Sequence, residues 1–303
     1  TYTAKFTKNG NGITSIKHET LSCTTEGDSL TCEVELPSIV MEDSNNYSVC
    51  GWSTNSETKT CEDATKVGEM VTLSTNNQVF YTVTKKNEVA LTANFNANGA
   101  TLACTASDDA TCENNDDLYV TTCKLKEAYN LDVQDTECVI NTPTITRSDF
   151  EIIGYNTDKN SNTSLLSSAS ALILNNENKG QTYYAITKKD VEITWNANDH
   201  TIGSTKSACT ILNTNKTCTI TTPTIEKEGY VILGWYDQSG NKFAGPGVNK
   251  EVSENAEYTA TSRAPDSTEV SYDSTNSNLT DASGNKCTDI QCAIDALARI
   301  TSN

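Results

Sequence analysis

The sequence predicts a mainly β protein in which three small domains follow one another and a short helix lies near the C-terminal end. Three observations carry this prediction: strands of alternating polarity, a motif that occurs three times, and twelve cysteines in a polar chain of 303 residues. A chain of this length exceeds the usual size of a single domain. Hydrophobic residues make up only 36% of it, which favours several small cores over one large core.

The recurring motif joins a proline, an aromatic residue and a glycine-aromatic pair. It reads TPTIEKEGYVILGWYD at 222–237, TPTITRSDFEIIGYNTD at 142–158 and LPSIVMEDSNNYSVCGWST at 36–54. We predict that its aromatic residues form the core of each domain, and that its glycine allows a bulge or the close approach of a neighbouring backbone. Sugar stacking on a tryptophan of the motif is the alternative. The predicted core residues are Tyr47, Gly51, Trp52, Phe150, Gly154, Tyr155, Tyr230, Gly234 and Trp235.

A strand of alternating polarity precedes each copy of the motif, and an aromatic strand follows it. Alternation that ends in Asn or Gly is typical of a half-buried strand followed by a turn. The opening strands lie within 2–12, 89–100 and 191–199, and the closing strands lie at 79–86, 182–189 and 256–263. We therefore predict a first domain at 1–86, a second at 87–189 with disulfide-closed inserts, and a third at 190–264.

The cysteines predict six local disulfides. Three pairs hold equivalent places just before the motif, and this recurrence argues for three equivalent bridges. Loops of this length contribute about 2–3 kcal/mol each in the chain-entropy model, and an even number of cysteines in a polar chain indicates an oxidising compartment. The six predicted pairs are Cys23 with Cys32, Cys50 with Cys61, Cys104 with Cys112, Cys123 with Cys138, Cys209 with Cys218, and Cys287 with Cys292.

Residues 265–303 are predicted to form a linker and a C-terminal amphipathic helix. Thr288 as N-cap and Gln291 three residues later fit a capping box. The last cysteine pair would act as a covalent version of the hydrophobic staple at this helix start. We expect the apolar stripe of the helix to contact another subunit or a partner. This stripe consists of Ile290, Ile294 and Leu297.

Composition and motifs exclude several classes of function. The net charge of −18 disfavours nucleic acid, because phosphate binding needs clustered Lys and Arg. We expect the acidic surface to keep the protein in solution, with a cation or basic partner as the alternative. The sequence has no run of 18 apolar residues, so it predicts no membrane-spanning helix. The chain starts at Thr with no signal peptide before it, so we expect a processed product or an excised segment.

No catalytic motif is present: there is no nucleophile elbow, phosphate loop, zinc-protease helix or dinucleotide fingerprint. Cysteine and histidine spacings do not fit zinc. We therefore predict a protein that is not an enzyme and has no catalytic residue, cofactor or metal. The acidic run DDATCENNDD offers four carboxylates to calcium, but it lacks EF-hand spacing, so a solvated loop is favoured. These carboxylates belong to Asp108, Asp109, Asp116 and Asp117.

The order of opening strand, Thr-Pro step, Gly-Trp pair and closing strand resembles the Listeria–Bacteroides repeat, the B-repeat type of internalin-like surface proteins. The resemblance covers residues 1 to about 263 in three copies and is best in the third. The second copy carries Tyr155 in place of Trp, and the first carries Cys50 before its glycine. The family implies small β-grasp-like domains in tandem on a bacterial surface. The dense cysteines depart from it.

The resemblance implies a non-catalytic bacterial protein, located outside the cell on its surface or on a surface appendage: a stalk, an adhesin or a filament subunit. The expected partners are a protein or glycan on another cell surface, or copies of the chain itself. The tail is similar to linkers of surface fibres and phage tail fibres, so a phage tail-fibre or receptor-binding segment is the first alternative. The second is an accessory repeat region of a secreted enzyme.

Overall fold

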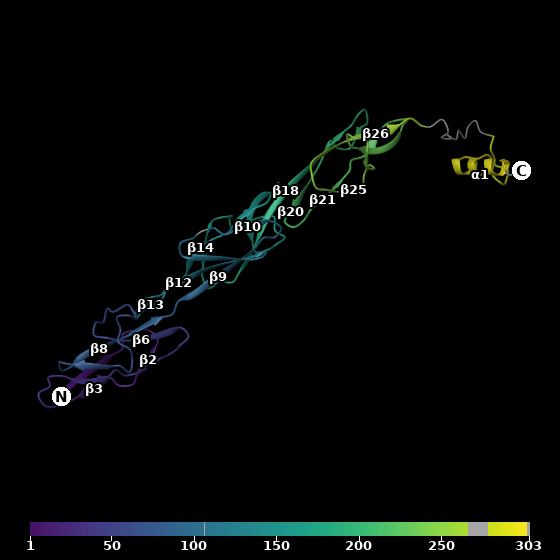
Figure 1. Ribbon diagram of the computed structural model, residues 1–303. Helices are drawn as coiled ribbons and strands as arrows, with labels where there is room; N and C mark the ends of the chain where they lie inside the picture. The colour runs from purple at the N-terminus through teal and green to yellow at the C-terminus, as the bar shows by residue number, and fades with distance from the viewer. Residues whose placement is uncertain (106, 266–277, 302–303) are drawn as a thin grey trace. The chain divides into compact units, whose positions relative to one another are not determined.

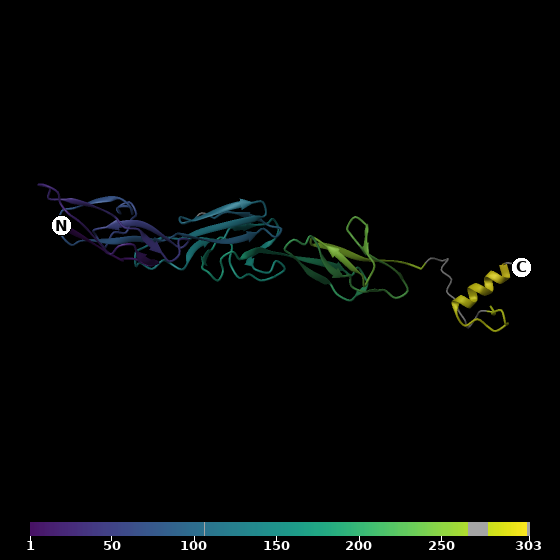
Figure 2. The same ribbon diagram turned by 90° about the horizontal axis from the view of Figure 1, so that it is seen from below.

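The computed structural model describes residues 1–105, 107–265 and 278–301. Strands dominate these ranges, and their one helix is α1 (Ile290–Thr301), drawn in yellow in Figures 1 and 2. The chain divides into two compact units. Unit 1 consists of Thr1–Lys189 and Leu212–Asn215, and unit 2 consists of Asp190–Ile211 and Lys216–Asn303. No helix in the described ranges is long and apolar enough to cross a membrane.

Eight strands lie in residues 1–86, which we call the first segment. They are β1 (Tyr2–Thr7), β2 (Ile13–Ile16), β3 (Thr20–Cys23), β4 (Cys32–Glu35), β5 (Ile39–Met41), β6 (Tyr47–Ser53), β7 (Met70–Leu73) and β8 (Gln78–Lys86). The opening strand β1 pairs with β3 in antiparallel and with the closing strand β8 in parallel orientation. The segment is thus closed by pairing between its own first and last strands.

The second segment (87–189) and third segment (190–264) contain the remaining strands. The second has β9 (Val89–Asn96), β10 (Thr101–Ala103), β11 (Ala110–Asn115), β12 (Leu118–Leu125), β13 (Ala128–Tyr129), β14 (Cys138–Asn141), β15 (Thr144–Thr146), β16 (Glu151–Asn156), β17 (Ala171–Leu174) and the start of β18 (Thr182–Asn196). The third continues β18 and adds β19 (Thr201–Ile202), β20 (Lys206–Leu212), β21 (Cys218–Thr221), β22 (Ile225–Glu226), β23 (Val231–Tyr236), β24 (Lys242–Ala244), β25 (Asn249–Val252) and β26 (Ala256–Arg263).

The same strand pairings recur in all three segments. Opening and closing strands pair in parallel as β1 with β8, β9 with β18, and β18 with β26. The strand of the glycine-aromatic motif pairs antiparallel with the closing strand as β6 with β8, β16 with β18, and β23 with β26. Short antiparallel pairs complete each set: β2 with β5, β10 with β15, β19 with β22, β4 with β7, β14 with β17, and β21 with β25.

The aromatic residue of the glycine-aromatic pair is fully buried in each segment. Trp52, Tyr155 and Trp235 are each 0% exposed, which excludes sugar stacking on the two tryptophans. The polar atom of each ring donates to the carbonyl of the motif proline: Trp52 Nε1 to Pro37 at 2.8 Å, Tyr155 Oη to Pro143 at 2.9 Å, and Trp235 Nε1 to Pro223 at 3.1 Å. Because a buried indole N–H or phenol O–H needs a partner, the proline and the aromatic residue of the motif depend on each other.

The motif glycines sit at β-bulges, as their sequence context predicted. Each pairing of the motif strand with the closing strand shifts register at the glycine, and φ is 140° at Gly51, 131° at Gly154 and 119° at Gly234. A Cβ at Gly154 would lie 2.2 Å from the carbonyl oxygen of Leu166. The glycine therefore serves both the bulge and the close approach of the following loop.

The prediction that Tyr230 belongs to the core is wrong. Its side chain is 47% exposed, and the Lys227 amine lies 4.4 Å from the ring centroid. It precedes β23 and packs against a lysine at the surface, where a cation–π contact stabilises the ring without burial. Its counterparts Tyr47 and Phe150 are half-buried.

Six disulfides join the same pairs that the sequence predicts, at sequence separations from 5 to 15. No cysteine is free in the described ranges. Since such bonds persist where the environment is oxidising, the chain belongs to an oxidising, extracellular type of compartment.

The C-terminal helix begins one residue later than predicted. Asp289 is its N-cap, because its Oδ1 accepts from the Cys292 N–H at 2.9 Å. The predicted capping box around Thr288 does not form, and Gln291 instead donates to Asp295 at 3.0 Å. Aspartate accepts well from orphan helix N–H groups and favours the positive end of the helix dipole. The stripe residues Ile290, Ile294 and Leu297 are 50%, 49% and 43% exposed.

We predict that Trp235→Ala lowers the free energy of unfolding by about 3–5 kcal/mol, the usual cost of removing a buried tryptophan. Tyr230→Ala, five residues away, is the control and should cost less than about 1 kcal/mol. Denaturant unfolding of the oxidised protein compares the two variants. Equal costs would contradict the burial of Trp235.

Gly154→Ala should destabilise the fold far more than Gly180→Ala. Both glycines have positive φ, 131° and 74°, but a Cβ at Gly180 meets nothing within 4 Å. Gly180→Ala therefore carries only the backbone strain, about 1–2 kcal/mol, whereas Gly154→Ala adds the clash with Leu166. Thermal unfolding of the two variants measures the difference, and equal melting temperatures would refute the clash.

Candidate functional site

Three loops share one design and form the candidate site. They lie at the C-terminal ends of β3, β12 and β20, and a disulfide closes the base of each with Cα–Cα distances of 5.8, 6.1 and 5.9 Å. We call residues 24–31, 124–137 and 210–217 the clasp loops. Because the disulfide holds the two ends of each loop together, the loop loses little further entropy when it takes a fixed conformation.

Each clasp loop contains the same turn around one left-handed residue. The turn hydrogen bonds run from Ser29 N to Glu26 O at 3.2 Å, from Asp132 N to Tyr129 O at 2.9 Å, and from Asn215 N to Leu212 O at 3.0 Å. The residue inside each turn has positive φ: 57° at Gly27, 54° at Asn130 and 51° at Asn213. Glycine and asparagine are the residues that tolerate this conformation best.

Asn130 binds the first segment with its backbone and its side chain. Its N–H donates to the Thr84 carbonyl at 2.8 Å, and its Oδ1 accepts from the Thr84 N–H at 3.1 Å. Its Nδ2 donates to the Thr58 carbonyl at 2.8 Å, and its carbonyl accepts from the Asn11 N–H at 2.9 Å. With the residue 8% exposed, all its polar groups are used to fasten the second segment to the first.

Asn213 repeats this contact inside unit 1, to which residues 212–215 belong. Its N–H donates to the Thr187 carbonyl at 2.9 Å, and its Oδ1 accepts from the Thr187 N–H at 3.1 Å. Its Nδ2 donates to the carbonyls of Lys159 and Ser161 at 2.9 and 3.1 Å. Arg147, whose pKa is lowered by burial, donates to the Asn213 carbonyl. We call Asn130 and Asn213 the clasp asparagines.

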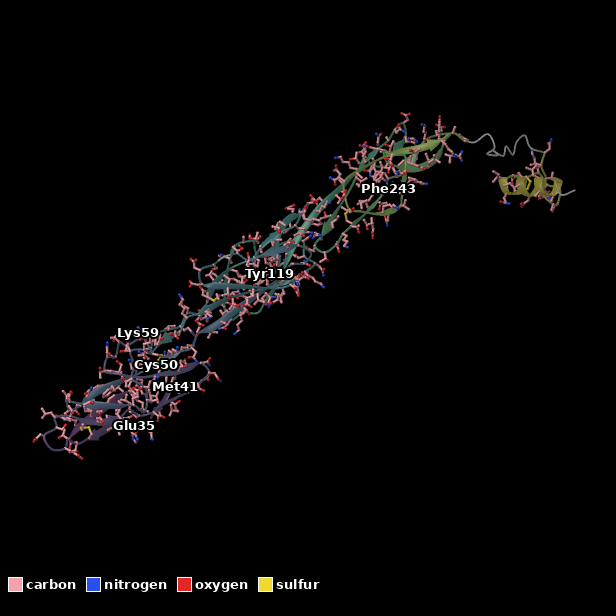
Figure 3. The ribbon with its side chains drawn as sticks, in the orientation of Figure 1. Glu35, Met41, Cys50, Lys59, Tyr119 and Phe243 are labelled. Atoms are coloured by element: carbon pink, nitrogen blue, oxygen red, sulfur yellow. A yellow bond between two sulfur atoms is a disulfide. The ribbon has the colours of Figure 1, made fainter. Side chains whose placement is uncertain are left out.

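Charged groups add to the contact around Asn130. Lys85, the neighbour of Thr84, pairs with Glu127 at 2.5 Å, and this bond together with one from Tyr129 lowers the pKa of Glu127. The hydrogen bond to Glu127 and burial raise the pKa of Tyr129 to about 12. Lys59, labelled in Figure 3, pairs with Asp132 at 2.7 Å. Because half-exposed pairs contribute little, the asparagine remains the main fastening.

The sequence prediction missed the clasp asparagines. It placed segment boundaries after residues 86 and 189 and assigned no contact to Thr84 and Thr187, which lie just before them. A signal was present: Gly27 and Asn213 both lie four residues after the first cysteine of a pair with a separation of 9. Two residues that favour positive φ at one position indicate a left-handed turn there.

The four acidic residues suggested for calcium do not come together. Strand β11 separates Asp108 and Asp109 from Asp116 and Asp117, and six extended residues span about 20 Å. Lys126 pairs with Asp109 at 3.8 Å. Within the described ranges, no group of three or more His, Cys, Asp or Glu could hold a metal ion.

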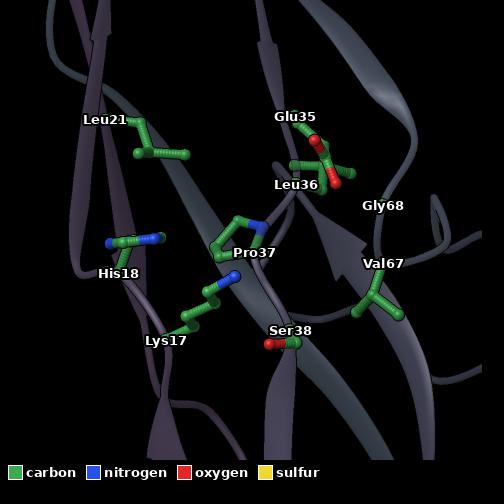
Figure 4. A pocket seen from close by; sticks show the side chains of 9 residues that line it. All are labelled: Lys17, His18, Leu21, Glu35, Leu36, Pro37, Ser38, Val67 and Gly68. Atoms are coloured by element: carbon green, nitrogen blue, oxygen red, sulfur yellow. The ribbon is translucent and has the colours of Figure 1, made fainter.

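A depression of about 360 Å³ lies in the first segment. Figure 4 shows the lining residues Lys17 and His18 on the left, Leu36 and Pro37 in the middle, and Val67 on the right. No hydrogen bond or ion pair joins Lys17, His18 and Glu35 in the described structure. The pocket is thus lined by buried apolar residues such as Leu36 and Pro37 and by exposed polar residues that do not bond one another.

Comparison with protein-family models, with curated proteins and with solved structures gave no match. The resemblance to the Listeria–Bacteroides repeat therefore rests on the motif residues alone.

We predict that Asn130→Gly costs about 1–3 kcal/mol, because it keeps the left-handed turn but leaves the buried Thr84 N–H without its acceptor. Asn130→Ala should cost about 1 kcal/mol more through backbone strain. Asn77→Gly is the control, since Asn77 has φ 60° in an exposed turn. Hydrogen exchange at the Thr84 amide should accelerate in both Asn130 variants. Unchanged exchange there would show that Asn130 does not hold this amide.

Proposed function

We propose that the chain is a non-catalytic, extracellular structural or adhesive protein of a bacterial surface: a stalk, an adhesin or a filament subunit. In this proposal the three segments are tandem β-grasp-like repeat domains of the Listeria–Bacteroides type. The observation that carries the proposal is the clasp at Asn130, which fastens one segment to the next through backbone and side-chain hydrogen bonds. An array whose purpose is mechanical needs such fastenings between successive units.

Recurrence of the strand pairings supports the repeat interpretation. Each segment pairs its opening strand with its closing strand in parallel, so each could bury its own core, as a repeat that forms a domain must. Disulfide-bonded cysteines pack in or against the cores of the first and second segments. Covalent loop closure compensates for little apolar burial in small extracellular domains.

We propose that the exposed surface of the chain binds partners. The proposed partners are a protein or glycan on another cell, or further copies of the chain. The half-exposed stripe of α1, with Ile290, Ile294 and Leu297, is the proposed oligomer or partner contact of the C-terminal region, because an apolar helix face of this kind gains stability when it is covered.

Antibodies raised against the oxidised chain should label intact cells of the bacterium that encodes it, and a mild protease should remove the label. Reduction before labelling should weaken recognition if the disulfides shape the surface. Label found only inside permeabilised cells would refute the proposal. Label on released virions would instead establish the phage tail-fibre alternative, and co-purification with a hydrolase on one polypeptide would establish the accessory-region alternative.

A further inference from the structure

A second depression, of about 570 Å³, lies within unit 1, where the second segment meets the third clasp loop. Its volume is in the range of pockets that hold a small organic molecule. Its walls come from the end of β9 and the turn after it, the β11–β12 turn, the loop after β16, strand β18 and the clasp loop. We call it the Tyr184 pocket. Its lining includes Asn96, Asp117, Lys159, Asn160, Tyr184 and Thr214.

Hydrogen bonds to the backbone hold the walls of the Tyr184 pocket in place. The Lys159 carbonyl accepts from Nδ2 of Asn98 and from Nδ2 of Asn213, at 2.9 Å each. The Ala97 N–H donates to the Asp117 carbonyl at 3.1 Å, which fixes the β11–β12 turn. The pocket is therefore formed before a ligand arrives, so binding needs little further ordering of the chain.

Three exposed side chains in the lining are not used by the fold. The Asp117 carboxylate, the Lys159 amine and the Asn160 amide make no hydrogen bond or ion pair with a described residue. A carboxylate only accepts, an ammonium only donates, and an amide does both. Since a sugar hydroxyl also does both, this set suits a ligand with several neighbouring hydroxyl groups.

The charges of the lining favour a neutral ligand. The carboxylate of Asp117 and the amine of Lys159 both line the pocket, so their charges offset each other. The net charge of −18 repels acidic ligands from the chain as a whole, because the charges of a protein add up to a field around it. A neutral sugar is therefore favoured over an acidic one.

Tyr184 gives the pocket an aromatic wall. Tyr183 is 6% exposed and faces the core, so Tyr184 points to the opposite face of β18. The ring of Tyr184 is half-buried and makes no aromatic or cation–π contact with a described residue. Its partner on β9 is Asn96. An aromatic ring beside an amide can pack against the C–H groups of a sugar while the amide bonds its hydroxyls.

Among the three segments, only the second combines this ring with an amide. In the first segment Tyr81 of β8 pairs with Thr7 of β1, so the ring lies beside a hydroxyl. In the third, Thr259 of β26 pairs with Asn196 of β18, so the amide has no ring beside it. Because the same strand pairing forms without the combination, the fold does not require it, and a binding role accounts for it.

We propose that the Tyr184 pocket binds one neutral sugar residue of a glycan. The sugar packs one face of its ring on Tyr184, and Asp117, Lys159 and Asn160 bond its hydroxyls. The inference rests on the proposed function, which includes a glycan on another cell among the partners, and it gives that glycan a site and a charge class.

Saturation-transfer NMR with the full oxidised chain tests the site. The probes are the methyl glycosides of glucose, galactose, mannose and N-acetylglucosamine, and N-acetylneuraminic acid is the acidic comparison. At least one neutral probe should bind with a dissociation constant on the order of 1 mM, as the usual binding efficiency per atom gives for a molecule of this size. The acidic sugar should bind several-fold more weakly than that probe.

Tyr184→Ala should weaken binding of the neutral probe about tenfold, because the contact of the ring with the sugar is lost. Tyr184→Phe keeps the ring and should retain most of the binding. Tyr81→Ala is the matched control, because Tyr81 holds the equivalent place in the first segment, and it should leave binding unchanged.

Asp117→Ala should weaken binding several-fold while the fold stays intact, since this exposed side chain makes no bond with a described residue. Glu113→Ala removes an exposed carboxylate from the same hairpin, outside the pocket lining. It is the matched control and should have no effect on binding.

Absence of binding by all four neutral probes, even well above the expected dissociation constant, would overturn the inference. Binding that Tyr184→Ala or Asp117→Ala leaves unchanged, that Tyr81→Ala removes, or that favours the acidic sugar would overturn it too. A chain found on the cell surface that binds no probe would leave the proposed function standing. A chain that binds sugar through Tyr184 but is absent from the surface would refute the function and keep the site.

Discussion

The hydrogen bond from a buried aromatic ring to a proline carbonyl is the interaction on which each segment depends. It joins the start of the motif to its end and places the ring under the opening strand. There the ring packs against an aromatic residue of that strand: the ring centroids are 5.0 Å apart for Trp52 and Phe6, 5.0 Å for Tyr155 and Phe95, and 4.6 Å for Trp235 and Trp195. Tyrosine can replace tryptophan in the second segment because its hydroxyl supplies the same donor. The glycine bulge directly before the ring lets the next loop cover it.

The disulfides and the clasp act together. A loop that must hold a left-handed residue against a neighbouring strand pays conformational entropy, and the bridge at its base removes most of that cost in advance. Asparagine at this place makes two backbone and two side-chain contacts, whereas glycine keeps only the backbone contacts. At the matching turn of the first clasp loop, Gly27 has no side-chain amide, so this loop lacks the two side-chain contacts that Asn130 makes.

Sequence patterns predicted what is local or repeated. Three disulfides followed from recurrence and three from the short spacing of the remaining cysteines, and the bulges followed from glycine before an aromatic residue. Tyr230 was wrongly assigned to the core, because packing decides whether a side chain just before a strand lies inside or at the surface. Lys227 covers its ring at the surface. Thr288 and Asp289 are both good caps, and only the structure separates them. The clasp asparagines were missed because their partners lie 26 and 46 residues away, in a chain where asparagine is common.

The short span of every disulfide has a consequence for a chain exposed to proteases. The bridges close loops with separations of 5 to 15 residues, so a cut inside any of these loops leaves the two pieces covalently joined. A nick at the exposed residues 24–31, for example, would leave Cys23 bonded to Cys32. The polypeptide would still transmit tension from one end to the other, and the damage would become visible as separate fragments only after reduction.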